Sequence, residues 1–187
     1  MLTGECLADG ADPRTPEIAA ALAYEQPIEA DLVLARWHAA AGRPREAGER
    51  LLAEFQAYRT DPWVYRPLVQ RSFRIVIPLA RADRALAARL YAALGSPFAA
   101  RMFDGQRRVT RIWLTREMEG PPHCAEAMAS LEPHVPWDEL FLTYRYACYR
   151  RAGSPLAEEA RRDLEDFLAA TPPKLAEGLA APTTTSP

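Results

Sequence analysis

Histidine and cysteine are the side chains that most often bind metal ions, and the chain places them close together once. His123 and Cys124 are adjacent, and His134 follows in the same stretch. Their spacing matches no common zinc pattern, and they fall at the start and at the end of one expected helix. We therefore expect no metal site, and we interpret Cys124 as a small packing residue.

Cys148 is the second residue that could carry chemistry, because a thiolate is a strong nucleophile. It lies among tyrosines in the stretch TYRYACYRR. A catalytic thiol needs a neighbouring base, and the sequence offers no candidate, so a buried thiol is the interpretation. His38, next to Trp37, is interpreted in the same way as a packed or half-exposed histidine and not as a ligand.

The familiar catalytic and cofactor motifs are absent from the sequence. It contains no G-x-G-x-x-G, no P-loop, no G-x-S-x-G, no H-E-x-x-H and no E-x-x-H pair of the diiron type. We predict a chain that is not an enzyme, with no catalytic residue and no cofactor. A catalytic helical protein whose site carries no known motif stays open as an alternative.

The distribution of charge is the most informative functional signal. Residues 1–58 have five Arg and ten acidic residues, a net charge of −5, and residues 59–116 have twelve Arg and three acidic residues, a net charge of +9. Residues 117–187 have six basic and twelve acidic residues, a net charge of −6. The basic middle either balances the acidic flanks within the fold or forms a surface for an acidic partner.

Arginine supplies nearly all of this positive charge, since the chain has 22 Arg and one Lys. The planar guanidinium holds a carboxylate with two parallel hydrogen bonds. We expect an acidic protein segment to bind the arginines of the middle segment that should line one face, which are Arg66, Arg71, Arg74, Arg101, Arg107, Arg108 and Arg111. Nucleic acid is the weaker alternative, because acidic flanks would repel phosphate.

Composition indicates which elements must position these side chains. The chain has 35 Ala and 21 Leu against 6 Val and 5 Ile, and Ala and Leu favour helix whereas β-branched residues favour strands. The fold class expected is therefore all-α. No apolar run is long enough to cross a membrane, and the three cysteines are odd in number and widely spaced, which argues against a disulfide framework. We expect a soluble, cytoplasmic chain without a membrane partner.

Prolines recur along the chain at a nearly constant interval. The gaps between Pro27, Pro62, Pro97, Pro136 and Pro172 are 35, 35, 39 and 36 residues. A large apolar residue follows each of the first four prolines. A period near 35 residues is typical of stacked helical hairpins, in which the proline ends one hairpin because it cannot continue the preceding helix.

Each interval can be divided into two helices. Gly42 is expected to end a first helix and Pro44 to begin the next, and Gly153 and Pro155 repeat this arrangement later. Ala47, Leu51, Phe55 and Tyr58 form one apolar stripe, as do Leu140, Tyr144, Ala147 and Cys148, and Asp83 is a predicted N-cap. The rings that follow the prolines, Trp63, Phe98 and Trp137, are expected to pack in the core between hairpins.

Two stretches fit this pattern badly. Pro78 falls inside an expected helix and should kink or end it. Asp104 and Gly105 fall inside another and should break it, which would account for the 39-residue interval.

The pattern resembles the tetratricopeptide (TPR) repeat family. That family has a small residue, a large apolar residue four positions later and a proline eight positions after that, and two triplets match. They are Cys124, Met128 and Pro136, and then Ala160, Leu164 and Pro172. The likeness extends over residues 28–172 in period and over scattered positions in motif. It implies antiparallel helical hairpins stacked as a short TPR-like α-solenoid, and it carries over no peptide-binding residue.

A second resemblance, over the whole chain and without a motif, is to the α-helical segment that trails some bacterial spermidine-synthase-like proteins. The Gly-rich cofactor loop of such a catalytic domain is absent. This resemblance implies an accessory helical domain associated with an enzyme.

The domain boundaries follow from the period. We predict a flexible N-terminus over 1–15, a single helical-repeat domain over 16–172 with units at about 28–62, 63–97, 98–136 and 137–172, and a disordered tail over 173–187. The leading functional hypothesis is a non-enzymatic protein–protein interaction or scaffold module with an Arg-rich central surface. The sequence leaves the oligomeric state open.

Overall fold

The computed structural model describes residues 2–118 and 121–171, and in these ranges it is all-helical, without a β-strand. The all-α prediction is therefore confirmed. The helices are α1 Leu2–Asp9, α2 Thr15–Ala23, α3 Pro27–Ala40, α4 Pro44–Ala57, α5 Arg66–Ala82, α6 Arg84–Ala93, η1 Arg101–Phe103 (a short 3₁₀ turn), α7 Asp104–Leu114, α8 Pro121–Ala129, α9 Glu139–Arg151 and α10 Ala157–Ala170.

The chain divides into two compact units, residues 1–134 and 135–187, where the sequence led us to expect one domain over 16–172. The first unit contains α1 to α8 and the second contains α9 and α10. Residues 1–15 were expected to be flexible, yet α1 lies within them and packs against α2 and α3. The tail predicted over 173–187 lies outside the described residues.

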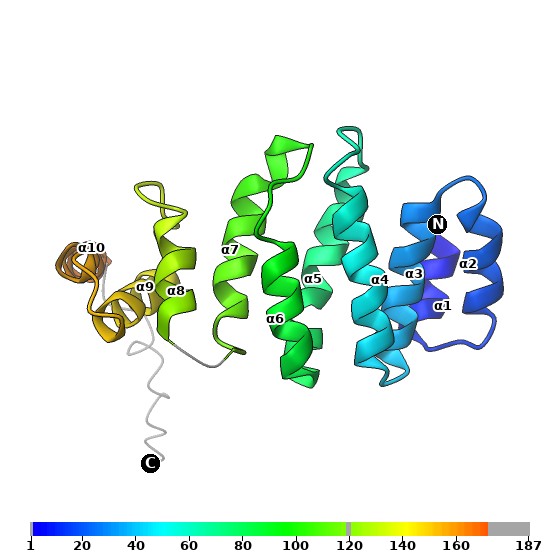
Figure 1. The fold of residues 1–187 in the computed structure, drawn as a ribbon, viewed down its shortest axis with the longest axis horizontal. Coiled ribbons are helices and arrows are strands. Elements are labelled where there is room, and N and C mark those ends of the chain that lie inside the picture. Colours follow the sequence, from blue (N-terminus) through cyan, green and yellow to red (C-terminus); the bar gives the residue numbers. More distant parts are fainter. Residues whose placement is uncertain (1, 119–120, 172–187) are drawn as a thin grey trace, which may run out of the picture. The chain divides into compact units, whose positions relative to one another are not determined.

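Helices of the first unit pack as successive hairpins. Consecutive helices pair as α1 with α2, α3 with α4, α5 with α6 and α7 with α8. The first helices of these pairs also contact one another in order, α1 with α3, α3 with α5 and α5 with α7, and α4 contacts α6. Within this unit, Figure 1 shows the connections α2–α3, α4–α5 and α6–α7 at the same end of the helices.

Glycine and proline end and begin the helices at several predicted positions. Gly42 has a φ of +70° after α3, and the Arg43 backbone N–H donates to the His38 carbonyl at 2.8 Å, closing the C-terminal turn. Pro44 then begins α4. Gly153, with a φ of +62°, follows α9 in the same manner.

The predicted N-cap is confirmed as well. Asp83 Oδ1 accepts hydrogen bonds from the backbone N–H groups of Ala85 at 2.9 Å and Leu86 at 3.3 Å. Such a cap stabilises a helix by about 1 kcal/mol.

Leu86 of α6 packs against Gly48 of α4. A Cβ added at Gly48 would lie 2.4 Å from a Leu86 methyl carbon. The glycine therefore sets the close approach of α4 and α6.

The junction prolines lie outside helix interiors where they can be seen. Pro62, Pro97 and Pro136 are in connections and Pro27 begins α3, as predicted, while Pro172 lies outside the described residues. Of the two outcomes expected at Pro78, a kink or an end of the helix, the second does not occur, because α5 continues through it.

The helix of the third interval was expected to break at Asp104 and Gly105, but it begins late instead. The short turn η1 precedes Asp104, and α7 begins only at that residue. Because Gly105 then lies in the first turn of α7, the irregular stretch precedes this helix and does not interrupt it.

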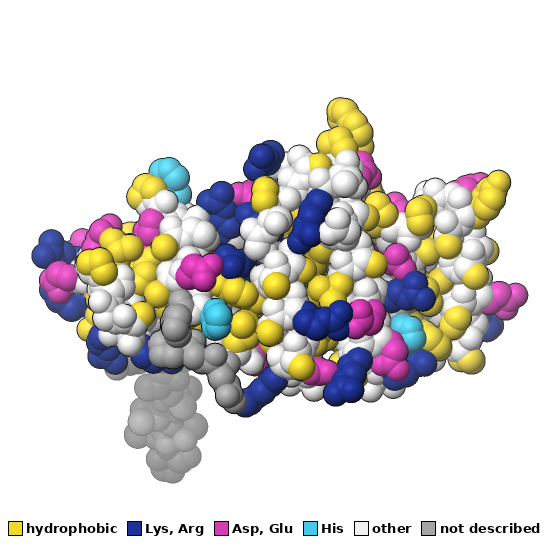
Figure 2. Space-filling model, in the orientation of Figure 1, with side chains coloured by type: hydrophobic (Ala, Val, Ile, Leu, Met, Phe, Trp, Pro, Cys, Tyr) yellow, Lys and Arg dark blue, Asp and Glu magenta, His cyan; other side chains and the backbone are white. Residues whose placement is uncertain are grey.

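The prediction that Trp63 and Trp137 are core residues is wrong. The Trp63 side chain is 90% exposed and that of Trp137 is 55% exposed, whereas Phe98 is 2% exposed. Trp63 sits in the short α4–α5 connection, where its backbone N–H donates to Asp61 Oδ1 at 2.8 Å. A side chain at such a turn has few neighbours to pack against, and Figure 2 shows hydrophobic side chains protruding above this connection.

The core stripe predicted for α4 is confirmed, because Ala47, Leu51, Phe55 and Tyr58 are all fully buried. The same stripe includes a residue that the sequence analysis missed. Glu54 is 1% exposed, and neither of its carboxyl oxygens has a hydrogen-bond partner among the described residues. Burial raises the pKa of this carboxyl well above its ordinary value of 4.5. The neutral acid is consequently the form that the core favours.

Because Glu54 is buried, we expect the stability of the protein to depend on pH. Because its pKa is raised in the folded state, its stabilising contribution is complete below pH 4.5 and is lost as the pH rises through the folded pKa. Above the unfolded pKa, the wild-type protein should lose up to about 1.4 kcal/mol of stability per pH unit relative to Glu54→Gln, until the folded pKa is reached. Urea unfolding of both proteins from acid to mildly alkaline pH measures this, and a constant difference would show that Glu54 is not the titrating group.

The second unit is a single helical hairpin in its described part. Asp138 caps α9 by accepting from the Phe141 backbone N–H at 2.9 Å, and the Trp137 and Phe167 rings lie 6.5 Å apart, edge to face. The predicted stripe of α9 is partly wrong, because Leu140 and Ala147 are exposed. The buried positions begin one residue later along the helix.

The cysteines differ in part from the expectation. Cys6 is a free and exposed thiol. Cys124 and Cys148 are buried as expected but are both disulfide-bonded, so the interpretation of Cys148 as a buried thiol is wrong.

Candidate binding site

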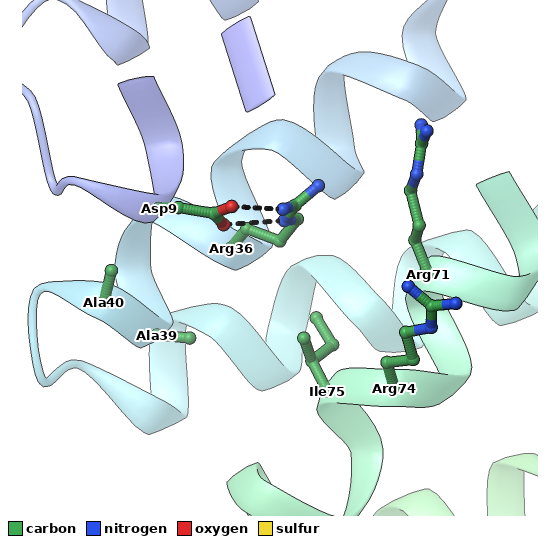
Figure 3. A pocket seen from close by; sticks show the side chains of 7 residues that line it. All are labelled: Asp9, Arg36, Ala39, Ala40, Arg71, Arg74 and Ile75. Atoms are coloured by element: carbon green, nitrogen blue, oxygen red, sulfur yellow. Dashed lines mark hydrogen bonds and ion pairs between the residues drawn. The ribbon is translucent and has the colours of Figure 1, made fainter. Parts of the chain in front are cut away.

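A pocket of about 330 Å³ opens between α1, α3 and α5 of the first unit. Three of its lining residues are arginines, one is an aspartate and three are apolar. We name it the arginine pocket, and its residues are Asp9, Arg36, Ala39, Ala40, Arg71, Arg74 and Ile75. Figure 3 shows that Arg71 and Arg74 extend from α5, while Asp9 and Arg36 meet on the α1 and α3 side.

Local helical geometry explains how α5 presents its two arginines. Arg71 and Arg74 are three residues apart, so they are neighbours on one face of the helix. Ile75 follows Arg74 directly and also lines the pocket. Pro78 has no N–H to donate to the Arg74 carbonyl one turn earlier, yet α5 continues and keeps both arginines on the same helix.

On the opposite side of the pocket, Asp9 holds Arg36 with two hydrogen bonds. Arg36 Nε donates to Asp9 Oδ1 at 3.0 Å, and Arg36 Nη2 donates to Asp9 Oδ2 at 2.5 Å. The Arg36 side chain is 17% exposed and that of Asp9 is 59% exposed. The bond joins the last residue of α1 to the middle of α3, and it places the only carboxylate among the lining residues against one of the three guanidinium groups.

Of the seven arginines predicted to bind a partner, the pocket brings together Arg71 and Arg74. Arg74 is exposed and makes no ion pair or side-chain hydrogen bond within the described part of the chain. Arg66 and Arg101 are likewise exposed and without such a contact there, but they do not line this pocket. The pocket therefore presents an unneutralised guanidinium, that of Arg74, to solvent.

The remaining three predicted arginines bind groups within the first unit. Arg107 is 5% exposed and donates to Asp104 and to the carbonyls of Leu94 and Gly95. Burial leaves little of this side chain for a partner, and its bonds hold α7 against the connection that precedes it.

Arg108 and Arg111 hold α7 to the region of α8. Arg108 donates to the Ser130 carbonyl at 2.6 Å, and Arg111 lies over the Tyr91 ring at 4.0 Å while it pairs with Glu126 at 3.1 Å. Each guanidinium thus already has partners inside the unit.

Ion pairs between segments neutralise part of the basic middle. Arg81 pairs with Glu117 at 3.0 Å and Arg89 pairs with Glu49, so that acidic residues from both flanking segments contact it. On the face of the first unit seen in Figure 2, basic side chains lie singly, several of them beside acidic ones. Ion pairs within the fold therefore neutralise part of the net charge of +9 in residues 59–116.

Arg36 and Asp9 are the pocket residues that the sequence analysis missed. Both lie in the segment with a net charge of −5, so a charge sum over 1–58 conceals a single arginine there. The signal that could have found Arg36 is its position on the first helix of a hairpin, since the first helices of neighbouring hairpins are in contact.

The other residues considered for chemistry do not line the arginine pocket. No group of three His, Cys, Asp or Glu there is arranged to hold a metal ion. The His123 ring stacks edge to face with Tyr91, whose hydroxyl donates to the His123 carbonyl at 3.2 Å. Burial lowers the pKa of His38, whose ring lies 5.0 Å from that of Trp37.

No described helix is both long and apolar enough to cross a membrane. No protein-family model, curated protein or solved structure matches the chain.

Proposed function

We propose that the chain is a non-enzymatic protein–protein interaction module, a short TPR-like α-solenoid that binds an acidic segment of a partner in the arginine pocket. The observation that carries the proposal is the charge of the pocket, in which three guanidinium groups face one carboxylate. A pocket of about 330 Å³ is also within the size range of ligand sites.

The packing of the helices supports the solenoid part of the proposal. The first helices α1, α3, α5 and α7 contact one another in sequence order, which is the arrangement of a repeat array in which each hairpin contacts its neighbours. The pocket lies along this row of first helices, so an extended partner segment could follow the row and place one acidic side chain in the pocket.

The carboxylate of the partner is expected to bind Arg74 most directly. A guanidinium binds a carboxylate through two parallel N–H donors, and Arg74 has no ion-pair partner in the described chain. Arg71, one turn away on the same helix, adds positive charge at the same opening. Because these groups are partly exposed, each contact contributes about 0–1 kcal/mol and the interaction weakens with salt.

The experiment measures binding of a fluorescein-labelled peptide in which Glu alternates with Ser, by fluorescence anisotropy at low and at physiological salt. Arg74→Ser is expected to weaken binding roughly fivefold, the equivalent of about 1 kcal/mol. Arg101→Ser removes the same charge from an exposed arginine outside the pocket, and it is the matched control.

A second peptide, with Gln in place of every Glu, tests whether charge drives the interaction. Equal binding of the two peptides, or equal losses for Arg74→Ser and Arg101→Ser, would contradict the proposal. Salt-insensitive binding would contradict it as well, because exposed charges are screened at physiological ionic strength.

A further inference from the structure

The ion pair between Asp9 and Arg36 occupies hydrogen-bond donors of the arginine pocket that a partner could otherwise use. Asp9 occupies Nε and Nη2 of Arg36, the pair of donors that a guanidinium offers to a carboxylate in bidentate geometry. Its carboxylate thus takes, on one pocket arginine, the place that a partner carboxylate would take. Figure 3 shows this ion pair across the pocket from Arg71 and Arg74.

We propose that Asp9 is an intramolecular competitor, a carboxylate at the end of α1 that lowers the affinity of the arginine pocket for acidic segments. The inference rests on the proposed function, because it concerns the same ligand. A partner that engages Arg36 must first displace Asp9, and a partner that does not must still approach its negative charge.

The environment of the ion pair favours replacement of Asp9 by a carboxylate of the partner. Asp9 is 59% exposed and is the last residue of α1, whereas Arg36 is only 17% exposed and lies within α3. The arginine is therefore held by its own helix, and the carboxylate is the partner that solvent and ligands can reach. Because solvent reaches the Asp9 carboxylate, a competing carboxylate that offers the same bidentate geometry can take its place on Arg36.

Asp12 offers a matched control in the same region. It pairs with Arg14 at 2.9 Å in the α1–α2 connection and does not line the pocket. Asp12→Asn removes the same charge as Asp9→Asn, close to it in sequence, and leaves Asp9 on Arg36. Comparison of the two variants separates a specific competitor from a general change in net charge.

The test uses the full chain and the labelled Glu–Ser peptide. Asp9→Asn is expected to bind roughly fivefold more tightly than the wild type, and Asp12→Asn within about twofold of it. Arg36→Ser should remove the gain when added to Asp9→Asn, and alone it should weaken binding, because it leaves the Asp9 carboxylate unpaired in the pocket. Circular dichroism of each variant verifies that the helices are retained.

Equal affinities of Asp9→Asn and the wild type would overturn the inference while leaving the proposed function intact. Equal gains in Asp9→Asn and Asp12→Asn would overturn it too, because general electrostatics would then explain both. If the Glu–Ser peptide binds neither the wild type nor Asp9→Asn, the proposed function fails and this inference fails with it.

Discussion

Replacing Phe98 by Ala is expected to lower the free energy of unfolding of the first unit by about 3–5 kcal/mol, as for other large buried aromatic residues. The Phe98 side chain is 2% exposed. Its ring lies 5.7 Å from Phe55, 5.4 Å from Tyr58 and 6.0 Å from Phe73. One side chain thus joins α4 and α5 to the connection between α6 and α7.

The backbone beside Phe98 strengthens this connection. The Ala99 N–H donates to the Tyr58 carbonyl at 2.9 Å, just beyond the C-terminus of α4. Loss of the ring would leave a cavity between three helical segments that the bonded backbone prevents from closing. The penalty therefore includes a cavity term as well as the lost burial of the ring.

Urea unfolding followed by far-UV circular dichroism measures the effect, and Trp63→Ala is the control. Both residues follow a junction proline, but Trp63 is 90% exposed, so its replacement should change stability by no more than about 0.5 kcal/mol. A loss for Trp63→Ala as large as that for Phe98→Ala would mean that the exposed ring packs in solution. A small loss for Phe98→Ala would mean that the contacts of Phe98 with the neighbouring rings contribute little to stability.

The contrast between Phe98 and Trp63 shows how much of the fold could be predicted from the sequence. Pro62, Pro97 and Pro136 marked connections between helices correctly, because proline cannot donate the hydrogen bond that continues a helix, although α5 tolerates Pro78. The burial of the following ring depends on which helices surround it in space. Phe98 reaches three aromatic neighbours, whereas the turn at Asp61 places Trp63 on the outside.

Burial of polar groups was the harder feature to predict. The stripe of Leu51, Phe55 and Tyr58 could be read from helical spacing, but Glu54 within the same helix was passed over because carboxylates are rarely buried without a partner. Its burial follows from the packing of α4. Arg107 is a similar case, since its sequence context is that of an exposed arginine.

The candidate site was only partly predictable for a related reason. Arg71 and Arg74 lie in the basic segment and on the first helix of their hairpin, and both were identified from these features. Arg36 belongs to an acidic segment and joins them only because α3 and α5 are in contact. A sum of charges along the chain averages over residues that the fold then separates into paired and unpaired groups.

Arg108 and Arg111 show why the binding test should use residues of the pocket. Both hold α7 through contacts with Ser130, Glu126 and Tyr91, so their replacement could weaken binding by loosening the fold. Arg74 is exposed and has no such contact in the described chain, and Arg71 lines the same opening. A change at Arg74 therefore tests binding more directly.

Reversing both charges, Arg71→Glu with Arg74→Glu, is expected to weaken binding of the Glu–Ser peptide by about a hundredfold or more. Two attractive contacts are lost, and like charges brought together at an interface cost several kcal/mol. The pocket would then hold three acidic residues and one arginine, Arg36, which Asp9 already binds. Arg101→Glu, outside the pocket, should weaken binding only a few-fold by its effect on net charge.

A peptide in which Lys replaces every Glu completes the experiment as a charge exchange. It should bind the doubly reversed protein and should bind the wild type poorly, because complementary charges select the partner. Recovery of binding in this combination cannot come from a damaged fold, since an unfolded pocket would bind neither peptide selectively. If the Lys–Ser peptide binds Arg101→Glu as tightly as it binds the doubly reversed protein, attraction between net charges explains the interaction and the arginine pocket is not its site.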